Sequence, residues 1–475
     1  MKSHRLLFFL ACLTAILVAA IYLDIWPALR GPGPFPEWHW RYFAKPTLDR
    51  LLPAVVTFGI LLVGLAAAGR VRRQAAHLAL RWVAVGLGLG LQWTLLSLEL
   101  PGSAETLIQR TEDPLFTSHH SVAKSPTVAD PRRFLETHAE LLPKLAVWAP
   151  HAATHPPGPT LFYRGLISFT RGSPWWRERL GSFTSRPATP ETTAALAGAL
   201  LLGLLGAATA VPLASLAGAL GSGAPAATRV AFLWGLVPGV SLMVPELDQA
   251  LALPVATSVV LVERGVRTNG LGGLLRTSLG GIVAAVGAFF SYGVPVFIAI
   301  GLAGVVFAHP TRLNDPARVA ALATTFIAGF ALIFGLPCLW GQAPIAGALT
   351  GLKIHREAYS QPRNYWTWLL FNPVDFLIFL GPPAALLSAR SLRSDSLRSD
   401  SARALTGFAR GCWLAALLWL TSGIVRGEVG RIAIPVFALL LVPCLTKRDS
   451  LGLAMGLALA LFVLDVTLRI HWQLP

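Results

Sequence analysis

Long apolar segments recur along the whole chain, and short polar segments separate them. Many of the apolar segments approach the roughly 20 residues that an α-helix needs to cross the hydrocarbon layer of a bilayer. Backbone groups cannot stay unpaired in lipid, so such segments must be helical, and no alternating β-barrel pattern competes. The pattern predicts an all-α, polytopic helical membrane protein that forms one integral-membrane domain over residues 1–475.

About thirteen spans are expected, and two pairs of them, 229–263 and 278–308, form tight hairpins or half-helices that do not fully cross. The first apolar run, within "MKSHRLLFFLACLTAILVAAIYLDIW", fits a retained span, with a cleaved signal peptide as the alternative. The expected spans are 6–26, 51–69, 82–98, 194–220, 229–244, 249–263, 278–292, 294–308, 319–338, 373–388, 411–424, 432–446 and 451–468.

The charge of the chain supports a membrane protein. Only 13% of its residues are charged, against about 25% in soluble proteins. The net charge of +16 comes largely from arginines in short loops between spans, which is typical of topology selection. The sequence contains no basic domain with interleaved aromatic residues, which is the pattern that would indicate nucleic-acid binding. The four cysteines have no zinc or disulfide spacing, so they do not identify a redox compartment.

The arginine-rich loops predict the orientation. With the N-terminus in the cytoplasm, every cytoplasmic loop is basic, including the linker 389–410 with its repeat "SLRSDSLRSDS". A solvated linker is the expected role of that repeat. The opposite, extracytoplasmic face then receives 27–50, 99–193, 245–248, 339–372, 425–431 and the C-terminal tail.

The extracytoplasmic loop 99–193 carries the first candidate chemistry. Within it, "ADPRRFLETHAELLPKL" predicts an amphipathic interfacial helix with Asp130 as N-cap and Pro131 at the first helical position. In "HAATHPPGPTLFYRG", the prolines favour an extended "HAATH" followed by a short helix.

His151 and His155 in this stretch have the i, i+4 spacing of a helical metal pair. Three hypotheses remain for His155: zinc ligation, a hydrogen bond or phosphate contact to a substrate, and a structural loop histidine. Arg164 follows in the predicted short helix.

Two acid-containing turns also face the extracytoplasmic side. Glu246 and Asp248 lie between apolar runs, and carboxylates this close to lipid usually have a paired or functional reason. Their spacing lets them share a cation or hold a sugar or amine, or else they cap the next helix. Glu428 and Arg431 form either a local ion pair or a phosphate-binding arginine oriented by the glutamate.

Further acids directly follow the third span, and any of them could act as a base: Glu99, Glu105, Glu112 and Asp113. The stretch 351–376 combines cations with aromatics, so it either covers a headgroup or anchors the interface.

Carboxylates, histidines and arginines thus concentrate on one face at membrane depth. That face lacks ATP and nucleotide sugars, so an enzyme there needs an activated donor that arrives in the bilayer, and a polyprenyl-phosphate sugar fits. Such a transfer needs a carboxylate base for the acceptor hydroxyl. It also needs cations or a metal for the phosphate leaving group, and its transition state is oxocarbenium-like.

The chain resembles the GT-C superfamily of integral-membrane glycosyltransferases, and within it the bacterial branch related to protein O-mannosyltransferases and aminoarabinose transferases. The resemblance lies within roughly 99–435, in "THPPGPTLFYRG", "PELDQALALP", "FFSYGVPVF", "FNPVDFLIFLGPP" and "RGEVGRIAIP". The family's acidic motif normally follows the first span, whereas the large loop here follows the third.

The resemblance implies a bacterial inner-membrane enzyme with its active site on the extracytoplasmic face. It implies inverting transfer of a sugar from a polyprenyl-phosphate donor to a glycan, lipid or protein acceptor, often with a divalent cation, magnesium or manganese. Glu246, Asp248 and an acid of 99–113 would handle the acceptor or cation. His155, Arg164 and Arg431 would hold the donor phosphate, and His151 and Glu428 complete the expected substrate-binding set.

Two other classes remain open. A secondary transporter fits the short hairpins and the Gly/Pro-broken spans of 229–308, although no inverted repeat is evident and the charges lie at span ends. A non-catalytic, lipid-handling assembly subunit predicts no turnover and tolerance of substitutions at His155 and Glu246.

Overall fold

The computed structural model describes residues 3–34, 36–43, 50–99, 101–114, 116–393, 400–446 and 448–473. Within these ranges the chain is helical, apart from one pair of two-residue strands, β1 (Arg41–Tyr42) and β2 (Trp472–Gln473). The expectation of an all-α protein is confirmed. Residues 394–399, which hold most of the "SLRSDSLRSDS" repeat and part of the predicted linker 389–410, lie outside the described residues.

Eight helical segments of the described chain are long and apolar enough to cross a membrane, and a bent pair raises the number to nine. The thirteen predicted spans are therefore not confirmed. The bent pair is α19 (Tyr365–Leu380) with α20 (Pro382–Arg390). The eight segments are α1 (Ser3–Tyr22), α3 (Gln74–Leu96), α10 (Pro190–Ala208) with α11 (Ala210–Ala219), α14 (Leu247–Arg267), α15 (Leu271–Ala288), α17 (Pro316–Gly335), α21 (Asp400–Thr421) and α24 (Leu451–His471).

The other four predicted spans are not single long helices in the structure. Three of them are shorter apolar helices: α2 (Leu51–Ala67), α16 (Val294–Ala308) and α23 (Ile434–Leu441) with the 3-10 turn that follows it. The fourth, 229–244, is divided into α12 (Ala224–Trp234) and α13 (Pro238–Leu242). Pro238 lacks an N–H and fits only a first helical turn, so a new helix starts there.

The 94° bend between α19 and α20 has a local cause. Gly381 has φ +85°, a left-handed conformation that favours glycine, and Pro382 and Pro383 follow it. Proline cannot donate the next helical hydrogen bond, so the first helix ends and the second starts in a new direction.

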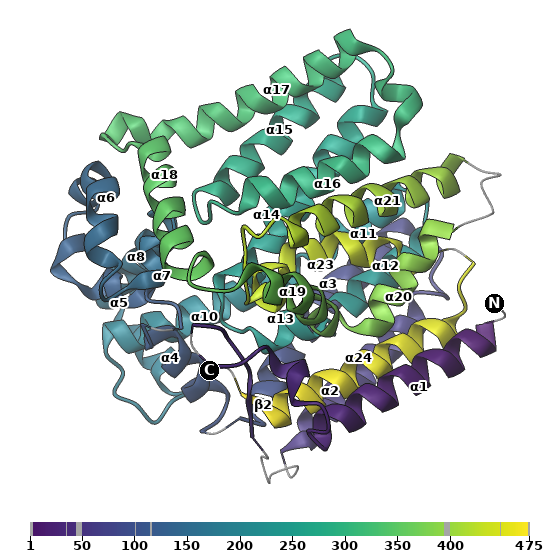
Figure 1. The fold of residues 1–475 in the computed structure, drawn as a ribbon, viewed down its shortest axis with the longest axis horizontal. Coiled ribbons are helices and arrows are strands. Elements are labelled where there is room, and N and C mark those ends of the chain that lie inside the picture. Colours follow the sequence, from purple (N-terminus) through teal and green to yellow (C-terminus); the bar gives the residue numbers. More distant parts are fainter. Residues whose placement is uncertain are drawn as a thin grey trace.

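Helix α14 lies at the centre of the bundle and packs against α10, α11, α15, α16 and α23 (Figure 1). Small residues bring the outer helices close together, as is common in membrane proteins. A Cβ atom on Gly281 of α15 would come within 2.0 Å of the Phe326 carbonyl oxygen on α17. Larger side chains at this glycine would push the two helices apart.

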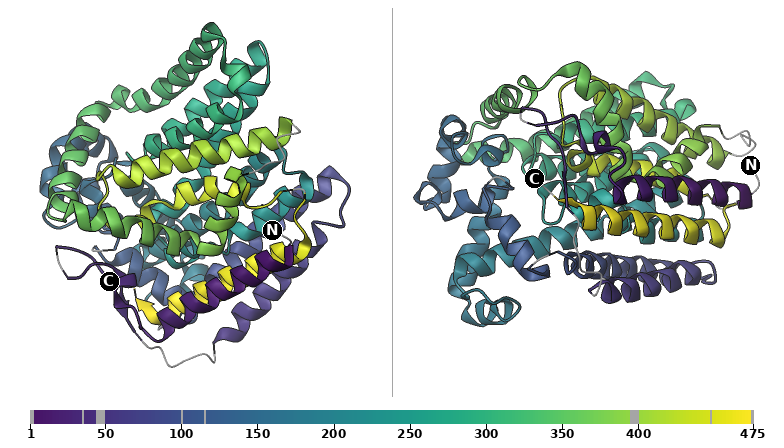
Figure 2. Two further views of the ribbon diagram at one scale, coloured as in Figure 1. Left: turned by 45° about the vertical axis from the view of Figure 1, so that its right-hand side comes forward. Right: turned by 60° about the horizontal axis from the view of Figure 1, so that its bottom comes forward.

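The loop 99–193 folds into short helices that gather at one end of the bundle, as the blue ribbons in Figures 1 and 2 show. The predicted helix of 129–145 is confirmed, because Asp130 accepts hydrogen bonds from the backbone of the first turn. "HAATH" was expected to be extended and is not, because Pro150 starts a short helical turn. The helices are α4 (Ser103–Glu112), α5 (His119–Lys124), α6 (Pro131–Leu145), α7 (Pro150–Ala153), α8 (Gly158–Gly172) and α9 (Pro174–Gly181).

The two ends of the bundle differ in composition. We call the end that carries α4–α9 the loop end. At this end β1 pairs antiparallel with β2, and this pairing joins the segment after α1 to the end of α24. We call the opposite end, where the arginines of residues 70–73, 264–276, 312–318 and 390–393 lie, the basic end. This segregation agrees with the alternation of loops that the sequence predicts.

Candidate functional site

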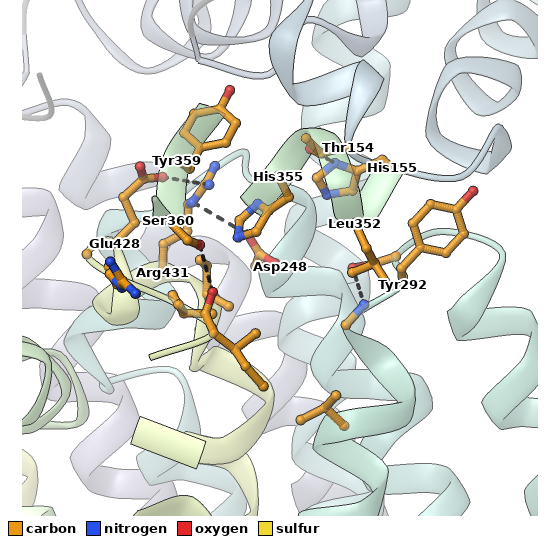
Figure 3. Close-up of a pocket in the computed structure, with 18 of the residues that line it drawn as sticks. Thr154, His155, Asp248, Tyr292, Leu352, His355, Tyr359, Ser360, Glu428 and Arg431 are labelled. Carbon is orange, nitrogen blue, oxygen red and sulfur yellow. Dashed lines mark hydrogen bonds and ion pairs between the residues drawn. The ribbon is translucent and has the colours of Figure 1, made fainter. Parts of the chain in front are cut away.

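A cavity of about 160 Å³ opens at the loop end, where segments far apart in the sequence meet (Figure 3). Its floor is the start of α14, and its walls include the start of α16, α18 (Pro344–His355), the π-helical turn η5 (Arg356–Ser360) and α22 (Val429–Ile432). The ionisable residues that line it are His151, His155, Asp248, Tyr292, His355, Tyr359, Arg363, Arg426, Glu428 and Arg431.

The guanidinium of Arg431 is the centre of this cluster. Its Nη2 lies 2.9 Å from Glu428 Oε2 and its Nη1 lies 3.1 Å from Glu246 Oε1. Its Nε lies 3.6 Å from Asp248 Oδ2. Figure 3 shows the side chains of Glu428 and Asp248 on either side of Arg431. The two acid-containing turns predicted from the sequence therefore form one charge cluster, and the local ion pair of Glu428 with Arg431 is only part of it.

The segment that carries Glu428 and Arg431 is held in place by α19. Asn372 donates to the Val425 carbonyl oxygen and accepts from the Gly427 N–H, at 2.8 and 3.1 Å. Asp375 accepts from the Gly430 N–H at 2.7 Å. These contacts explain why the "FNPVDF" stretch lies beside the cavity: its polar side chains fix the backbone that presents the charges.

The turn itself needs glycine. Gly427 has φ +91° and Glu428 has φ +59°, so two consecutive residues are left-handed. A Cβ atom on Gly427 would lie 2.7 Å from Arg363 Nη1 and 3.0 Å from the Trp368 ring. The close approach lets Arg363 Nη2 reach Glu428 Oε1 at 3.1 Å.

Two carboxylates of the cluster, Glu246 and Glu428, have pKa values that are shifted in opposite directions. Burial raises the pKa of Glu246 to about 7, and the nearby Asp248 adds to the rise while Arg431 opposes it. Burial also favours the neutral form of Glu428, but Arg431 and Arg363 together outweigh it and lower the pKa of Glu428 to about 2. Near neutral pH Glu428 is therefore ionised, whereas Glu246 can gain or lose a proton.

His155 is a neutral ring with a fixed tautomer. Burial lowers its pKa to about 3, because a charged imidazolium is costly away from water. Its Nδ1 lies 2.7 Å from the His151 carbonyl oxygen, which can only accept. The proton is therefore on Nδ1, and Nε2 is left with a lone pair. Such a ring accepts a hydrogen bond from a hydroxyl and does not donate one to a phosphate through Nε2.

The acids that directly follow the third span lie outside this cavity. Glu99 pairs with Arg110 at 2.7 Å and with the buried Arg469 of α24. Arg186 pairs with Glu105 at 3.0 Å and with Glu112 at 2.8 Å. These carboxylates form ion pairs that tie the loop helices to each other and to the bundle.

Asp113 and Arg164 also lie outside the cavity lining, and Glu246 is connected to it through Arg431. Asp113 is exposed at the end of α4. Arg164 is a half-buried residue of α8 whose Nη2 donates to the Ala129 carbonyl oxygen at 3.3 Å. The predicted set thus divides, and only His151, His155, Glu246, Asp248, Glu428 and Arg431 come together.

The structure adds residues that the candidate set left out. Arg363 and His355 come from the stretch 351–376, whose mixture of cations and aromatics was the available sequence signal. Tyr359 comes from the same stretch, and Tyr292 lies in "FFSYGVPVF". Nothing in the spacing of Tyr292 distinguishes it from an interfacial tyrosine.

The carboxylates of the cluster do not form a vacant metal site. The Arg431 guanidinium occupies the space between Glu246, Asp248 and Glu428, where a divalent cation would need their oxygens. In the described part of the chain, no group of three or more His, Cys, Asp or Glu side chains has a metal-binding arrangement. The donor set at this cluster therefore does not fit a resident magnesium or manganese ion.

No protein-family model matches the chain, and no curated protein matches it.

Proposed function

We propose that this protein is a membrane glycosyltransferase of the GT-C type, which moves a sugar from a polyprenyl-phosphate donor to an acceptor on the extracytoplasmic face of a bacterial inner membrane. The observation that carries the proposal is the composition of the cavity at the loop end. The charge cluster lines it together with the apolar side chains of Val296, Leu352 and Ile424, all of which are exposed. A lipid-linked substrate needs this combination of a polar centre and an apolar entrance.

The apolar entrance suits the lipid part of the donor. Val296 and Phe297 come from the start of α16, and Trp419 lies near the end of α21. Phe297 and Trp419 form an edge-to-face pair with ring centroids 5.8 Å apart. Because these helices meet lipid, a polyprenyl chain can lie against them while its phosphate reaches the charge cluster.

The arginines suit the phosphate of the donor. Three guanidinium groups line the cavity, those of Arg363, Arg426 and Arg431. Arg363 pairs with Glu428, and Arg431 pairs with Glu246, Asp248 and Glu428. When Glu246 takes up a proton, the cluster gains one net positive charge. A phosphate can then bind bidentately to arginine, which holds its oxygens in a planar fork.

In the proposed reaction Asp248 is the base. Its carboxylate takes the proton of the acceptor hydroxyl, whose oxygen forms the new bond to the anomeric carbon. The bond from that carbon to the phosphate oxygen breaks, and the arginines stabilise the charge on the departing polyprenyl phosphate. Attack from the face opposite the leaving group inverts the configuration. The lone pair of His155 Nε2 accepts a hydrogen bond from a substrate hydroxyl and orients it.

A secondary transporter remains the competing proposal, because two predicted spans are discontinuous. The break between α12 and α13 and the 94° bend between α19 and α20 resemble the broken helices of transporters. The charge cluster lies at the loop end, however, which favours chemistry at a surface over passage through the bundle.

The deciding experiment is a turnover assay on the purified chain. It uses polyprenyl-phosphate sugars that are labelled in the sugar, and compares the native chain with Asp248→Asn. The matched control is Glu140→Gln, which changes an exposed acid of α6. We expect label to leave the lipid with the native chain and the control, and at least 100-fold less release with Asp248→Asn. No release with any donor, together with substrate-dependent uptake into liposomes, would favour the transporter.

A further inference from the structure

A second cavity lies at the basic end, opposite the candidate site. It is open to the surface, has a volume of about 640 Å³ and is lined by α3, α11, the start of α12, α14 and α15. Four arginines line it: Arg81, Arg264, Arg267 and Arg276. No acidic residue is among the described residues that line it.

The charges of this cavity are poorly compensated. Arg267 lies 3.6 Å from the buried Glu263, which also contacts His309 at 3.3 Å. The Arg264 guanidinium makes no hydrogen bond or ion pair to the described residues, and Arg276 Nη1 donates to the Thr268 hydroxyl at 2.5 Å. The positive charges of four arginines that line one cavity repel each other unless an anion lies between them.

The deepest of the four arginines has an unmet hydrogen bond. Nε of Arg81 is buried and has no partner within the described ranges of the chain. Leaving a charged donor buried without an acceptor is costly. Because Arg81 lines the cavity, an oxygen-rich anion there would compensate its charge.

The surroundings favour an anion that belongs to a lipid. On α15, Leu275 and Leu279 are exposed and lie one residue before and three residues after Arg276 in the sequence. On α3, Leu78 and Trp82 are exposed on either side of Arg81 in the sequence. Acyl chains can therefore lie along both helices while the phosphate is held at their ends, as in basic pockets between transmembrane helices.

We propose that this cavity binds the phosphate group of an anionic phospholipid in the leaflet at the basic end. Arg81 and Arg264 hold the phosphate oxygens, and Arg276 borders the headgroup. The hydroxyls of Ser215 and Thr268, which also line the cavity, suit the polar headgroup. The proposal is independent of what happens at the loop end.

The test compares lipid binding by purified, delipidated protein in detergent. Phosphatidylglycerol, phosphatidylcholine and inorganic phosphate are added separately, and bound lipid is counted by native mass spectrometry. The test variant is Arg81→Gln/Arg264→Gln. The control is Arg72→Gln/Arg73→Gln, which removes two exposed arginines from the same end but outside the cavity.

We expect phosphatidylglycerol to bind the native chain and the control alike, and the test variant roughly 30-fold more weakly, since each arginine near the surface contributes about fivefold. Melting in detergent without added lipid shows whether each variant is folded; if the double variant does not fold, the same comparison uses Arg264→Gln alone, with Arg72→Gln as its control.

Equal weakening in test and control would overturn the proposal, because the arginines would then act only through general charge. Equal binding of phosphatidylcholine would also overturn it. If inorganic phosphate competes with phosphatidylglycerol in the native chain but not in the test variant, the phosphate contact is supported. If inorganic phosphate protects the chain from melting and phosphatidylglycerol does not, the proposal that the bound phosphate group belongs to a lipid is wrong.

Discussion

Nη1 of Arg431 lies 3.1 Å from Oε1 of Glu246, and the same guanidinium reaches Glu428 through Nη2 at 2.9 Å. One arginine thus joins the start of α14 to the turn before α22. Because its side chain is only 15% exposed, the charges on both sides depend on it for compensation.

Arg431→Gln should therefore damage both stability and activity. Removing one partner from a buried ion pair leaves uncompensated charge and typically costs about 3–5 kcal/mol. We expect a melting temperature lower by several degrees and at least 100-fold slower sugar release. Arg431→Lys keeps the charge without the planar fork and should recover stability more than activity. Equal recovery of both would show that the fork does not contact substrate.

The Glu246 carboxyl should set the pH dependence of donor binding. Its pKa is raised to about 7, so it is protonated below that pH and ionised above it. Ionisation removes the extra positive charge of the cluster, so the KM for the donor should rise as the pH increases through about 7. In Glu246→Gln the KM should stay low and flat across the same range. A steep rise that persists in Glu246→Gln would assign the titration to another group.

His155 should act as a hydrogen-bond acceptor. The oxygen of glutamine can replace Nε2, whereas the shorter asparagine cannot reach the same point. We expect His155→Asn to raise the KM for the acceptor about tenfold, the value of one neutral hydrogen bond, and His155→Gln to raise it less. Because the His155 pKa is about 3, neither variant should change the shape of the pH profile between pH 5 and 8. A lost inflection in that range would contradict the neutral ring.

Chelation should leave turnover unchanged. The Arg431 guanidinium already lies between the three carboxylates, so no step needs a resident divalent cation. The measurement is the rate of sugar release with EDTA, magnesium or manganese. A loss of more than tenfold in EDTA, restored by one of the metals, would show that a cation enters with the substrate.

Gly427→Ala should disturb the turn that presents Glu428. Its φ is +91°, and the new Cβ atom would lie 3.0 Å from the Trp368 ring. Strain of this kind costs about 1–3 kcal/mol, so both melting temperature and turnover should fall. The control is Gly86→Ala on α3, where a Cβ atom meets nothing within 4 Å. That change should leave turnover intact, and an equal loss in both variants would remove the special role of the turn.

The sequence by itself determined the class of the protein. Apolar runs must be helical in lipid, and basic loops segregate to one end, so helices and their alternation follow from composition and period. The N-cap of α6 at Asp130 was equally local and was predicted correctly. The thirteen predicted spans are not confirmed, and hydrophobicity alone does not reveal that the chain bends by 94° at Gly381 or that 229–244 divides at Pro238.

The tertiary structure alone decided which candidates share a site. Glu99, Glu105 and Glu112 follow a span just as Glu246 does, and their residue type does not separate them. They differ in their partners: the first three bind arginines of the loop and of α24, whereas Glu246 binds Arg431, whose side chain lines the cavity. Ion pairs between distant segments depend on how helices pack, and short-range sequence patterns contain no information about that packing.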